Sequence, residues 1–284
     1  NTLYAANLVK EAVGSKFIYD SHELWVHRHR AGRRAPLEKI LDKYVERQLI
    51  QNVDQIITVC DSIGDWLLDH YEDISTPLIL RNMPFKVNEK LSLKRQCIKT
   101  RLNISDDSIV VVYTGKFTTG RGISSGLKLV SELEGFHFVM LGYGDPVFSA
   151  QLHEKINELG IQNKVTICAP VPYSEVTSFI SGADLALVYI EPICLSYEYA
   201  LPNKLFESIQ AGIPILGANL VEIKKIVNGM DVGVCFDSES ALINSLKVLK
   251  MTNIIKWREN IEKIKMELSW EVESLKLISC YNKL

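Results

Sequence analysis

Short apolar runs alternate with longer stretches of helical spacing along the whole chain. Strand-like runs such as QIITVC and IVVVYTG are nearly continuous in β-branched and other apolar residues, and amphipathic stretches such as residues 37–50 separate them. Near-continuous apolar strands are typical of parallel sheets that helices cover on both faces. The pattern therefore predicts an α/β protein with mainly parallel sheets.

A polar stretch at residues 84–94 divides this pattern into two series. The first series predicts strands in KFIYD, QIITVC and PLILRN, after a helix already in progress at residues 1–13. Since only three strands are visible there, we expect an incomplete amino-terminal domain at residues 1–85 and a second domain at residues 86–268. The second series predicts strands from IVVVYTG to GVCF, helices at 123–133, 148–159, 174–182 and 221–227, and helical segments over 241–284.

Composition and charge narrow the function classes. The 284 residues are 47% hydrophobic and 23% charged, and the net charge of −2 offers no basic field for nucleic acid. No window approaches the roughly 18 apolar residues that a membrane span needs, and no signal peptide is recognisable. The six cysteines form no Cys-x-x-Cys pair, which favours buried thiols in a reducing cytoplasm over metal binding.

The stretch ALPNKLFESIQAGIP carries more polar groups than a helix start requires. Pro202 suits the first helical position, where its missing N–H costs nothing. Lys204 follows at the positive end of the helix, where an acidic residue is normally preferred, so a bound anion is expected to offset its charge. Glu207 shares a face with Lys204 and suits the hydroxyl pair of a ribose. The alternative interpretation is an ordinary surface Lys–Glu pair.

The stretch VVVYTGKFTTGRGIS predicts a second anion site at a strand-to-helix junction. Its strand is expected to end at Thr114, and glycines and cations follow in the loop. The loop is not a Walker A motif, because Arg121 stands in place of the lysine and Gly122 in place of the hydroxyl residue. It also lacks the Gly-x-Gly-x-x-Gly pattern of a dinucleotide dehydrogenase. The alternative is a glycine turn with two solvated cations. The candidate residues are Gly115, Lys116, Gly120, Arg121 and Gly122.

Weaker candidates lie in the first series. KFIYD delivers an Asp-Ser-His-Glu stretch to the end of its strand, where His22 suits a role toward a substrate hydroxyl or sugar oxygen. The arginines of VHRHRAGRR suit phosphates or anionic lipid headgroups. For each, an ordinary loop, capping or solvated role is the alternative. The candidate acceptor-side residues are Asp20, His22, Arg28, Arg30, Arg81 and Asn82.

In this order and spacing, the motifs resemble glycosyltransferases of the GT-B fold, most closely family 4, the retaining glycosyl transferase group 1 type. The resemblance rests on DSHEL, the glycine loop, GYG at 142–144, PNKLFESIQAGIPIL and EIKKIVNGMDVG, and it covers essentially the whole chain. It implies two Rossmann-like domains facing a cleft, with the acceptor on the amino-terminal domain and a nucleotide-sugar donor on the other. It also implies that a terminal helix at about 269–284 returns to the first domain.

The resemblance further implies residue roles. Lys116 and Arg121 match the cations that hold the donor diphosphate, Glu207 matches the ribose-binding glutamate, and His22 matches a histidine near the transferred sugar. These three roles make His22, Lys116, Arg121 and Glu207 the catalytic candidates. The other donor-binding candidates are Gly144 of the GYG motif, Pro170 and Val171 in the loop that flanks the base, and Asn203 and Lys204, whose helix amino-terminal amides meet the phosphates.

One position departs from the family pattern. The family often has a second glutamate eight places before the ribose-binding one, where it contacts the donor sugar. Tyr199 stands there in this chain, and Glu198 is one place away. The expected sugar contact is therefore either Glu198 or another group.

The resulting hypothesis is transfer of a sugar from a nucleoside diphosphate sugar, UDP- or GDP-linked, to an acceptor hydroxyl. Retention of configuration is implied by the resemblance alone. No Asp-x-Asp metal motif is present, so we expect neither a metal nor another cofactor. The expected setting is bacterial surface polysaccharide synthesis in the cytoplasm, with a sugar or lipid-linked acceptor and possible contact with the inner membrane face. The alternatives are a sugar-nucleotide epimerase of the same fold and a catalytically silent sugar-nucleotide-binding subunit.

Overall fold

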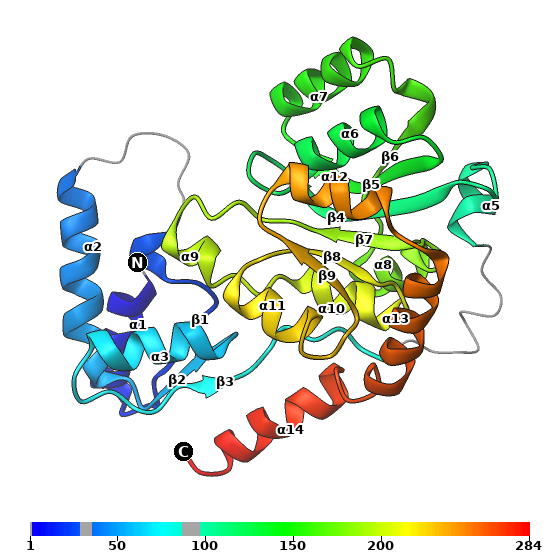
Figure 1. Ribbon diagram of the computed structural model, residues 1–284. Coiled ribbons are helices and arrows are strands. Elements are labelled where there is room, and N and C mark those ends of the chain that lie inside the picture. Colours follow the sequence, from blue (N-terminus) through cyan, green and yellow to red (C-terminus); the bar gives the residue numbers. More distant parts are fainter. Residues whose placement is uncertain (1, 29–35, 87–96) are drawn as a thin grey trace. The chain divides into compact units, whose positions relative to one another are not determined.

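The computed structural model describes residues 2–28, 36–86 and 97–284, which form two compact units (Figure 1). The first unit comprises residues 1–82, 192–201 and 272–284. The second comprises residues 83–191 and 202–271. The hydrophobic pattern does not indicate that residues 192–201 belong with the first unit, because this segment interrupts the second series.

The first unit contains a parallel sheet of three strands in the order β1-β2-β3, which confirms the number of strands predicted there. Its centre is apolar, since Ile56 and Ile57 of the middle strand are almost fully buried. The strands are β1 (Ile18–Ser21), β2 (Gln55–Thr58) and β3 (Leu78–Ile79). The helices are α1 (Thr2–Val13), η1 (Trp25–His27), α2 (Pro36–Leu49), η2 (Ile50–Asn52), α3 (Asp61–His70), α9 (Leu195–Glu198) and most of α14 (Trp270–Tyr281).

A buried carboxylate joins α2 to this sheet. Glu46 is 3% exposed and accepts hydrogen bonds from the hydroxyls of Tyr19, at 2.9 Å, and Tyr71, at 3.0 Å. Burial raises the pKa of Glu46, and the two hydroxyl donors oppose that shift. Both donors are needed because a buried carboxylate without partners would strongly destabilise the unit.

The second unit contains six parallel strands in the order β6-β5-β4-β7-β8-β9 (Figure 1). This is the order of a doubly wound nucleotide-binding sheet. Successive strands are added toward one edge from β4 to β6 and toward the other edge from β7 to β9, so the strand order reverses between β4 and β7. Ligands of such sheets bind at the carboxyl ends of the strands beside that reversal. The strands are β4 (Ile109–Phe117), β5 (Phe136–Gly144), β6 (Val165–Cys168), β7 (Leu185–Val188), β8 (Ile215–Ala218) and β9 (Gly233–Phe236).

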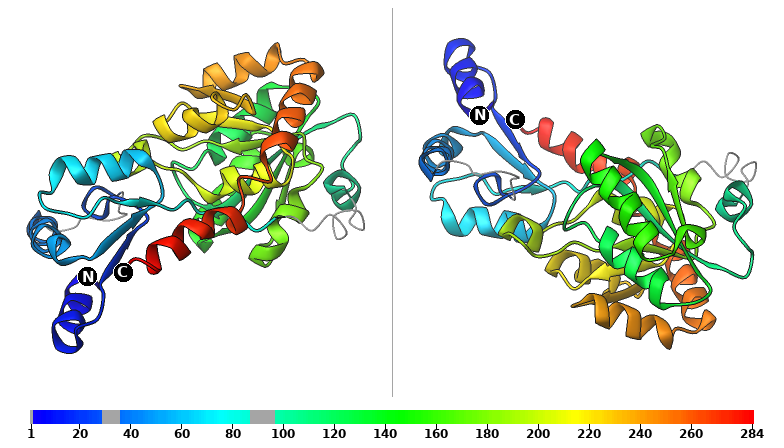
Figure 2. Two further views of the ribbon diagram at one scale, coloured as in Figure 1. Left: turned by 90° about the horizontal axis from the view of Figure 1, so that it is seen from below. Right: turned by 90° about the horizontal axis from the view of Figure 1, so that it is seen from above.

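Helices cover both faces of this sheet (Figure 2). The predicted helix at residues 221–227 has the expected bounds, and the other three differ by one to two residues at their ends. The helices are α5 (Ile98–Leu102), α6 (Ile123–Glu132), α7 (Pro146–Glu158), η3 (Gln162–Lys164), α8 (Tyr173–Ile180), α10 (Asn203–Gln210), α11 (Val221–Val227), α12 (Glu239–Lys247) and α13 (Met251–Ile264).

The prediction that the first strand of this unit ends at Thr114 is wrong. The strand β4 continues to Phe117 and stays paired with β5 through Gly115↔Gly142 and Phe117↔Gly144. Glycine makes this extension possible, because a Cβ atom on Gly142 would lie only 1.9 Å from the carbonyl oxygen of Gly115. Gly115 and Lys116 therefore lie on a paired strand rather than in a loop.

Candidate functional site

The glycine loop of the second unit lies at the reversal of strand order. It connects the end of β4 to α6, and the backbone N–H of Glu191, beyond β7, donates to the carbonyl of Gly120 at 3.0 Å. Gly122 precedes α6 with a φ of +86°, and a Cβ there would lie 2.8 Å from the Cβ of Tyr189. Both the backbone conformation and the space therefore require glycine at this position.

Helix α10 begins beside this loop with an uncapped amino terminus. The expectation that Pro202 occupies the first helical position is wrong, because Pro202 has extended dihedrals and the helix starts at Asn203. Among the described residues no side chain caps this end, so the first-turn amides are available to an anion. Asn203 is exposed, whereas Lys204 and Glu207 are only 8% and 7% exposed. An exposed Lys–Glu pair is therefore excluded.

Glu207 is held by the strand beneath it. Its carboxylate accepts a hydrogen bond of 3.2 Å from the Thr114 hydroxyl of β4. Burial raises the pKa of Glu207, while Thr114 and the charge of Lys204 oppose the shift. Burial and the charge of Glu207 in turn raise the pKa of Tyr173, at the start of α8. Glu207 thus presents a fixed acceptor suited to hydroxyl donors.

Lys204 lies in an environment that disfavours its charge. Its ammonium nitrogen is 4.1 Å from the centre of the Tyr113 ring and 3.4 Å from the carbonyl oxygen of Arg121. Burial and the neighbouring Arg121 guanidinium lower the pKa of Lys204 to about 7, against the opposing effect of Glu207. The Tyr113 hydroxyl donates to the carbonyl of Lys116 at 2.7 Å, so this ring links α10 to the end of β4.

The structure thus brings the predicted phosphate-binding residues into one part of the second unit. Lys116 is exposed and Arg121 is half-buried. Gly144 lies at the end of β5, opposite Phe117. Pro170 and Val171 lie apart from α10 in the sequence, in the loop between β6 and α8. The group that clusters around the reversal consists of Gly115, Lys116, Gly120, Arg121, Gly122, Asn203, Lys204 and Glu207.

Sequence reasoning missed three residues that shape this cluster. Tyr113 and Thr114 contact Lys204 and Glu207, and Tyr189 packs against Gly122. All three lie in or directly after apolar strands and look like core residues. Their hydroxyl groups were a signal that could have identified them, because a buried tyrosine or threonine hydroxyl normally requires a hydrogen-bond partner.

A second, smaller cluster lies in the first unit. His22 Nε2 is 3.1 Å from Asp20 Oδ2, and His22 Nδ1 is 3.2 Å from the Asn82 side-chain nitrogen. The hydrogen bond with Asp20 is the main cause that raises the pKa of His22, although burial opposes it. A cavity of about 360 Å³ is lined by Asp20, His22 and Trp25, among others. The ring of His22 is thus oriented on both sides.

The other acceptor-side candidates have structural partners. The guanidinium of Arg28 lies 3.4 Å from the centre of the Trp25 ring and pairs with Glu23 at 3.4 Å. Arg81 pairs with Asp61 at 3.8 Å. Arg30 and the rest of residues 29–34 in the stretch VHRHRAGRR lie outside the described residues. Arg28 and Arg81 are thus occupied by contacts within the first unit.

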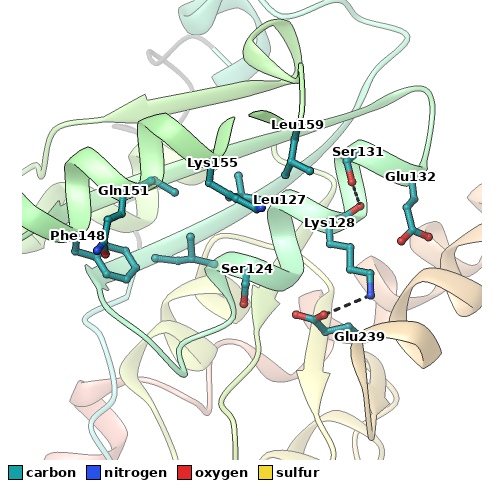
Figure 3. Close-up of a pocket in the computed structure, with 12 residues that line it drawn as sticks. Ser124, Leu127, Lys128, Ser131, Glu132, Phe148, Gln151, Lys155, Leu159 and Glu239 are labelled. Atoms are coloured by element: carbon teal, nitrogen blue, oxygen red, sulfur yellow. Dashed lines mark hydrogen bonds and ion pairs between the residues drawn. The ribbon is translucent and has the colours of Figure 1, made fainter. Parts of the chain in front are cut away.

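A cavity of about 630 Å³ lies between α6 and α7 (Figure 3). Its lining is largely apolar and includes Leu127 and Leu152. Lys128 at its edge pairs with Glu239 at 3.6 Å. Among the described residues, none of the candidate site residues lines this cavity.

Two further findings concern metals and membranes. Within residues 2–28, 36–86 and 97–284, no group of three or more His, Cys, Asp or Glu side chains is arranged to hold a metal ion. In the same part of the chain, no helix has both the length and the hydropathy of a membrane span.

Comparisons with known proteins give one family and one fold. The sequence profile of the family described as Glycosyl transferases group 1 matches residues 94–263. No curated protein is significantly similar in sequence to this chain.

Solved structures resemble the chain in fold. Sucrose-phosphate synthase from Thermosynechococcus elongatus is 16% identical with a TM-score of 0.76, over 99% of this chain and 71% of that one. Anabaena HepE in complex with UDP-glucose is 12% identical with a TM-score of 0.77, over 99% and 76%. WaaG, a glycosyltransferase involved in lipopolysaccharide biosynthesis, is 15% identical with a TM-score of 0.65, over 97% and 80%. These similarities confirm the GT-B fold.

Proposed function

The chain belongs to the glycosyl transferases group 1 family and is a glycosyltransferase, and we propose that its donor is a nucleoside diphosphate sugar, UDP- or GDP-linked. The acceptor in this proposal is a hydroxyl of a sugar or a lipid-linked sugar. The observation that carries the proposal is the burial of a cation, Lys204, and of a carboxylate, Glu207, on the same helix at the sheet reversal. The cation suits the phosphates of a ribose diphosphate, and the carboxylate suits its ribose hydroxyls.

The donor occupies the second unit, within residues 86–268, in this proposal. Its diphosphate lies against Lys116, Arg121 and the amino terminus of α10, where positive charge and open amides are available. The ribose hydroxyls donate to Glu207. The base lies along residues 169–172, between β6 and α8. Anabaena HepE, of the same fold, is known in complex with UDP-glucose, which supports a UDP-sugar.

Catalysis in this proposal depends on stabilising the departing diphosphate. The bond between the anomeric carbon and the diphosphate oxygen breaks, a bond to the acceptor oxygen forms, and the proton of the acceptor hydroxyl passes to the departing diphosphate or to water. Fixed cations and helix amides supply positive charge to the leaving group without reorganising. His22, oriented by Asp20 and Asn82, contacts the transferred sugar, and retention of configuration is expected.

Calorimetry with UDP, GDP and ADP and their sugars tests the donor site. We expect one nucleotide series to bind, and Arg121→Ala or Glu207→Ala to weaken it by about 10–150-fold, as loss of a charged hydrogen bond of about 1.5–3 kcal/mol implies. Lys128→Ala is the matched control, because Lys128 lies on α6 but pairs with Glu239. Binding of no nucleotide, or unchanged binding by both site variants, would falsify the assignment.

A turnover assay separates the enzyme classes. With a suitable acceptor, a transferase yields nucleoside diphosphate and glycosylated acceptor in equal amounts. An epimerase yields nucleoside diphosphate and an altered sugar when no acceptor is present. A silent binding subunit yields neither product while still binding the donor.

The acceptor side is proposed to be residues 1–85 together with about 269–284, working in the cytoplasm at the inner membrane face. Helix α2 supports membrane contact, because it exposes an apolar stripe at i, i+3, i+4 and i+7 spacing. The resemblance in fold to WaaG supports surface polysaccharide synthesis as the setting. Flotation with vesicles containing phosphatidylglycerol tests this, and an Ile40→Glu, Leu41→Glu double variant should lose binding. The stripe consists of Leu37, Ile40, Leu41 and Tyr44.

A further inference from the structure

The side chain of Lys204 has fewer partners than a buried ammonium group requires. An ammonium carries three donors and is normally paired when it is buried. Among the described residues, its one hydrogen bond is the 3.4 Å contact with the Arg121 carbonyl, although the residue is only 8% exposed. Across the same part of the chain, Lys204 forms no ion pair within 4.0 Å, and Glu207 acts on it through its charge alone. The site is therefore built for an acceptor that the protein does not itself supply.

Groups from each element packed against Lys204 affect the stability of its positive charge. Arg121, in the loop after β4, repels the ammonium, whereas Glu207, on the same helix, attracts it. The attraction is limited, because the Glu207 carboxylate is turned to the Thr114 hydroxyl. From β4 comes the face of the Tyr113 ring, which stabilises a cation weakly. Tyr173, on α8, is a neutral neighbour of Glu207, and burial and the charge of Glu207 raise the pKa of the Tyr173 hydroxyl.

We propose that Lys204 takes up a proton from solvent when the donor diphosphate binds, so that the protein binds its donor more weakly as the pH rises above neutrality. This inference rests on the proposed donor site and adds a proton to its binding reaction. The proton passes from water or buffer to the Lys204 nitrogen, and no other bond forms or breaks. Two phosphate charges cancel the repulsion from Arg121 and supply the missing hydrogen-bond acceptors.

The direction of the pH dependence follows from linkage. Burial and Arg121 lower the pKa of Lys204 to about 7, and the charge of a bound dianion raises it. Below that pH the amine is already protonated, and donor affinity does not change with pH. Above it, each pH unit lowers the affinity by up to about tenfold, until the pH passes the pKa of the occupied site. An ordinary surface lysine would remain charged throughout this range.

Calorimetry of UDP-glucose binding in buffers with different ionisation enthalpies measures the proton directly. UDP-glucose is the probe because its diphosphate is esterified at both ends and does not itself titrate between about pH 6 and pH 8. With a pKa of about 7, we expect an uptake of about 0.9 proton at pH 8 and about 0.1 proton at pH 6. An uptake below roughly 0.3 proton at pH 8, with binding intact, overturns the inference.

Two variants identify the group that takes up the proton. Lys204→Arg keeps the positive charge but cannot lose it near neutral pH, so UDP-glucose should still bind with almost no proton uptake. Lys116→Gln is the matched control, since Lys116 is an exposed cation of the same proposed site. It should bind more weakly and keep the full uptake. Full uptake by Lys204→Arg would assign the proton to another group and overturn the inference.

The same titrations separate this inference from the proposed function. If UDP-glucose does not bind, GDP-mannose and ADP-glucose are titrated in the same buffers. Binding of none of them overturns both the donor site and the proton uptake. Binding without uptake overturns only the role of Lys204.

Discussion

Replacing Gly122 with alanine tests whether the glycine loop must lie directly against the end of β7. The new Cβ would lie 2.8 Å from the Cβ of Tyr189 and 2.9 Å from its carbonyl oxygen, directly after the last residue of β7. The residue also has a φ of +86°, which costs an alanine about 1–2 kcal/mol. Overpacking against a fixed backbone costs about 1–3 kcal/mol more, so we expect a total loss of about 2–5 kcal/mol.

Gly135→Ala is the matched control for this variant. Gly135 also belongs to the second unit and has a φ of +75°, but nothing lies within 4 Å of the position that its Cβ would take. It should therefore lose only the backbone contribution of about 1–2 kcal/mol. The difference between the two variants, about 1–3 kcal/mol, isolates the contact with Tyr189.

Urea unfolding of the second unit, followed through the buried Trp257, measures both losses. Calorimetry with UDP provides a second readout, because a displaced loop moves Arg121 and the first amides of α6. We expect Gly122→Ala to bind UDP roughly tenfold more weakly or worse, and Gly135→Ala to bind normally. Equal losses of stability in the two variants would refute the contact between the loop and Tyr189.

Three further predictions concern buried or paired titratable groups. Burial raises the pKa of Glu207, so its carboxylate costs the folded state stability as the pH rises from the unfolded pKa to the folded pKa. Glu207→Gln should therefore unfold at a higher urea concentration than the parent at about pH 8, with little difference at about pH 4. Its UDP binding should fall by about 10–150-fold. Asp20→Asn should lower the pKa of His22, seen as an acid shift of its ring-proton titration in NMR, and an unchanged titration would contradict the hydrogen bond. Tyr71→Phe removes one donor from buried Glu46 and should cost about 1–3 kcal/mol in urea unfolding of the first unit, and a loss below about 0.5 kcal/mol would show that the bond contributes little.

Part of the candidate site could be predicted because it lies in short, contiguous motifs. Lys204 and Glu207 stand three residues apart on one helix, and the glycines and cations of the strand-to-helix junction span residues 115–122. Parallel strands bring such strand-to-helix junctions to one edge of a sheet, so their chemical types already indicated an anion site. The error at Thr114 arose because Gly115, which indicated the start of a loop, instead pairs closely with Gly142 in the sheet.

The sequence by itself determined the α/β class, the three strands of the first unit and the identity of the main anion-binding candidates, because these follow from local periodicity and residue chemistry. Only the tertiary structure decided that Lys204 is buried and that Glu207 is held by Thr114, 93 positions away. It also decided that Tyr113 faces Lys204 and that Tyr189 packs behind Gly122. These contacts depend on β4 lying beside β7, and that neighbourhood comes from the long-range packing of crossover units, which no local pattern records.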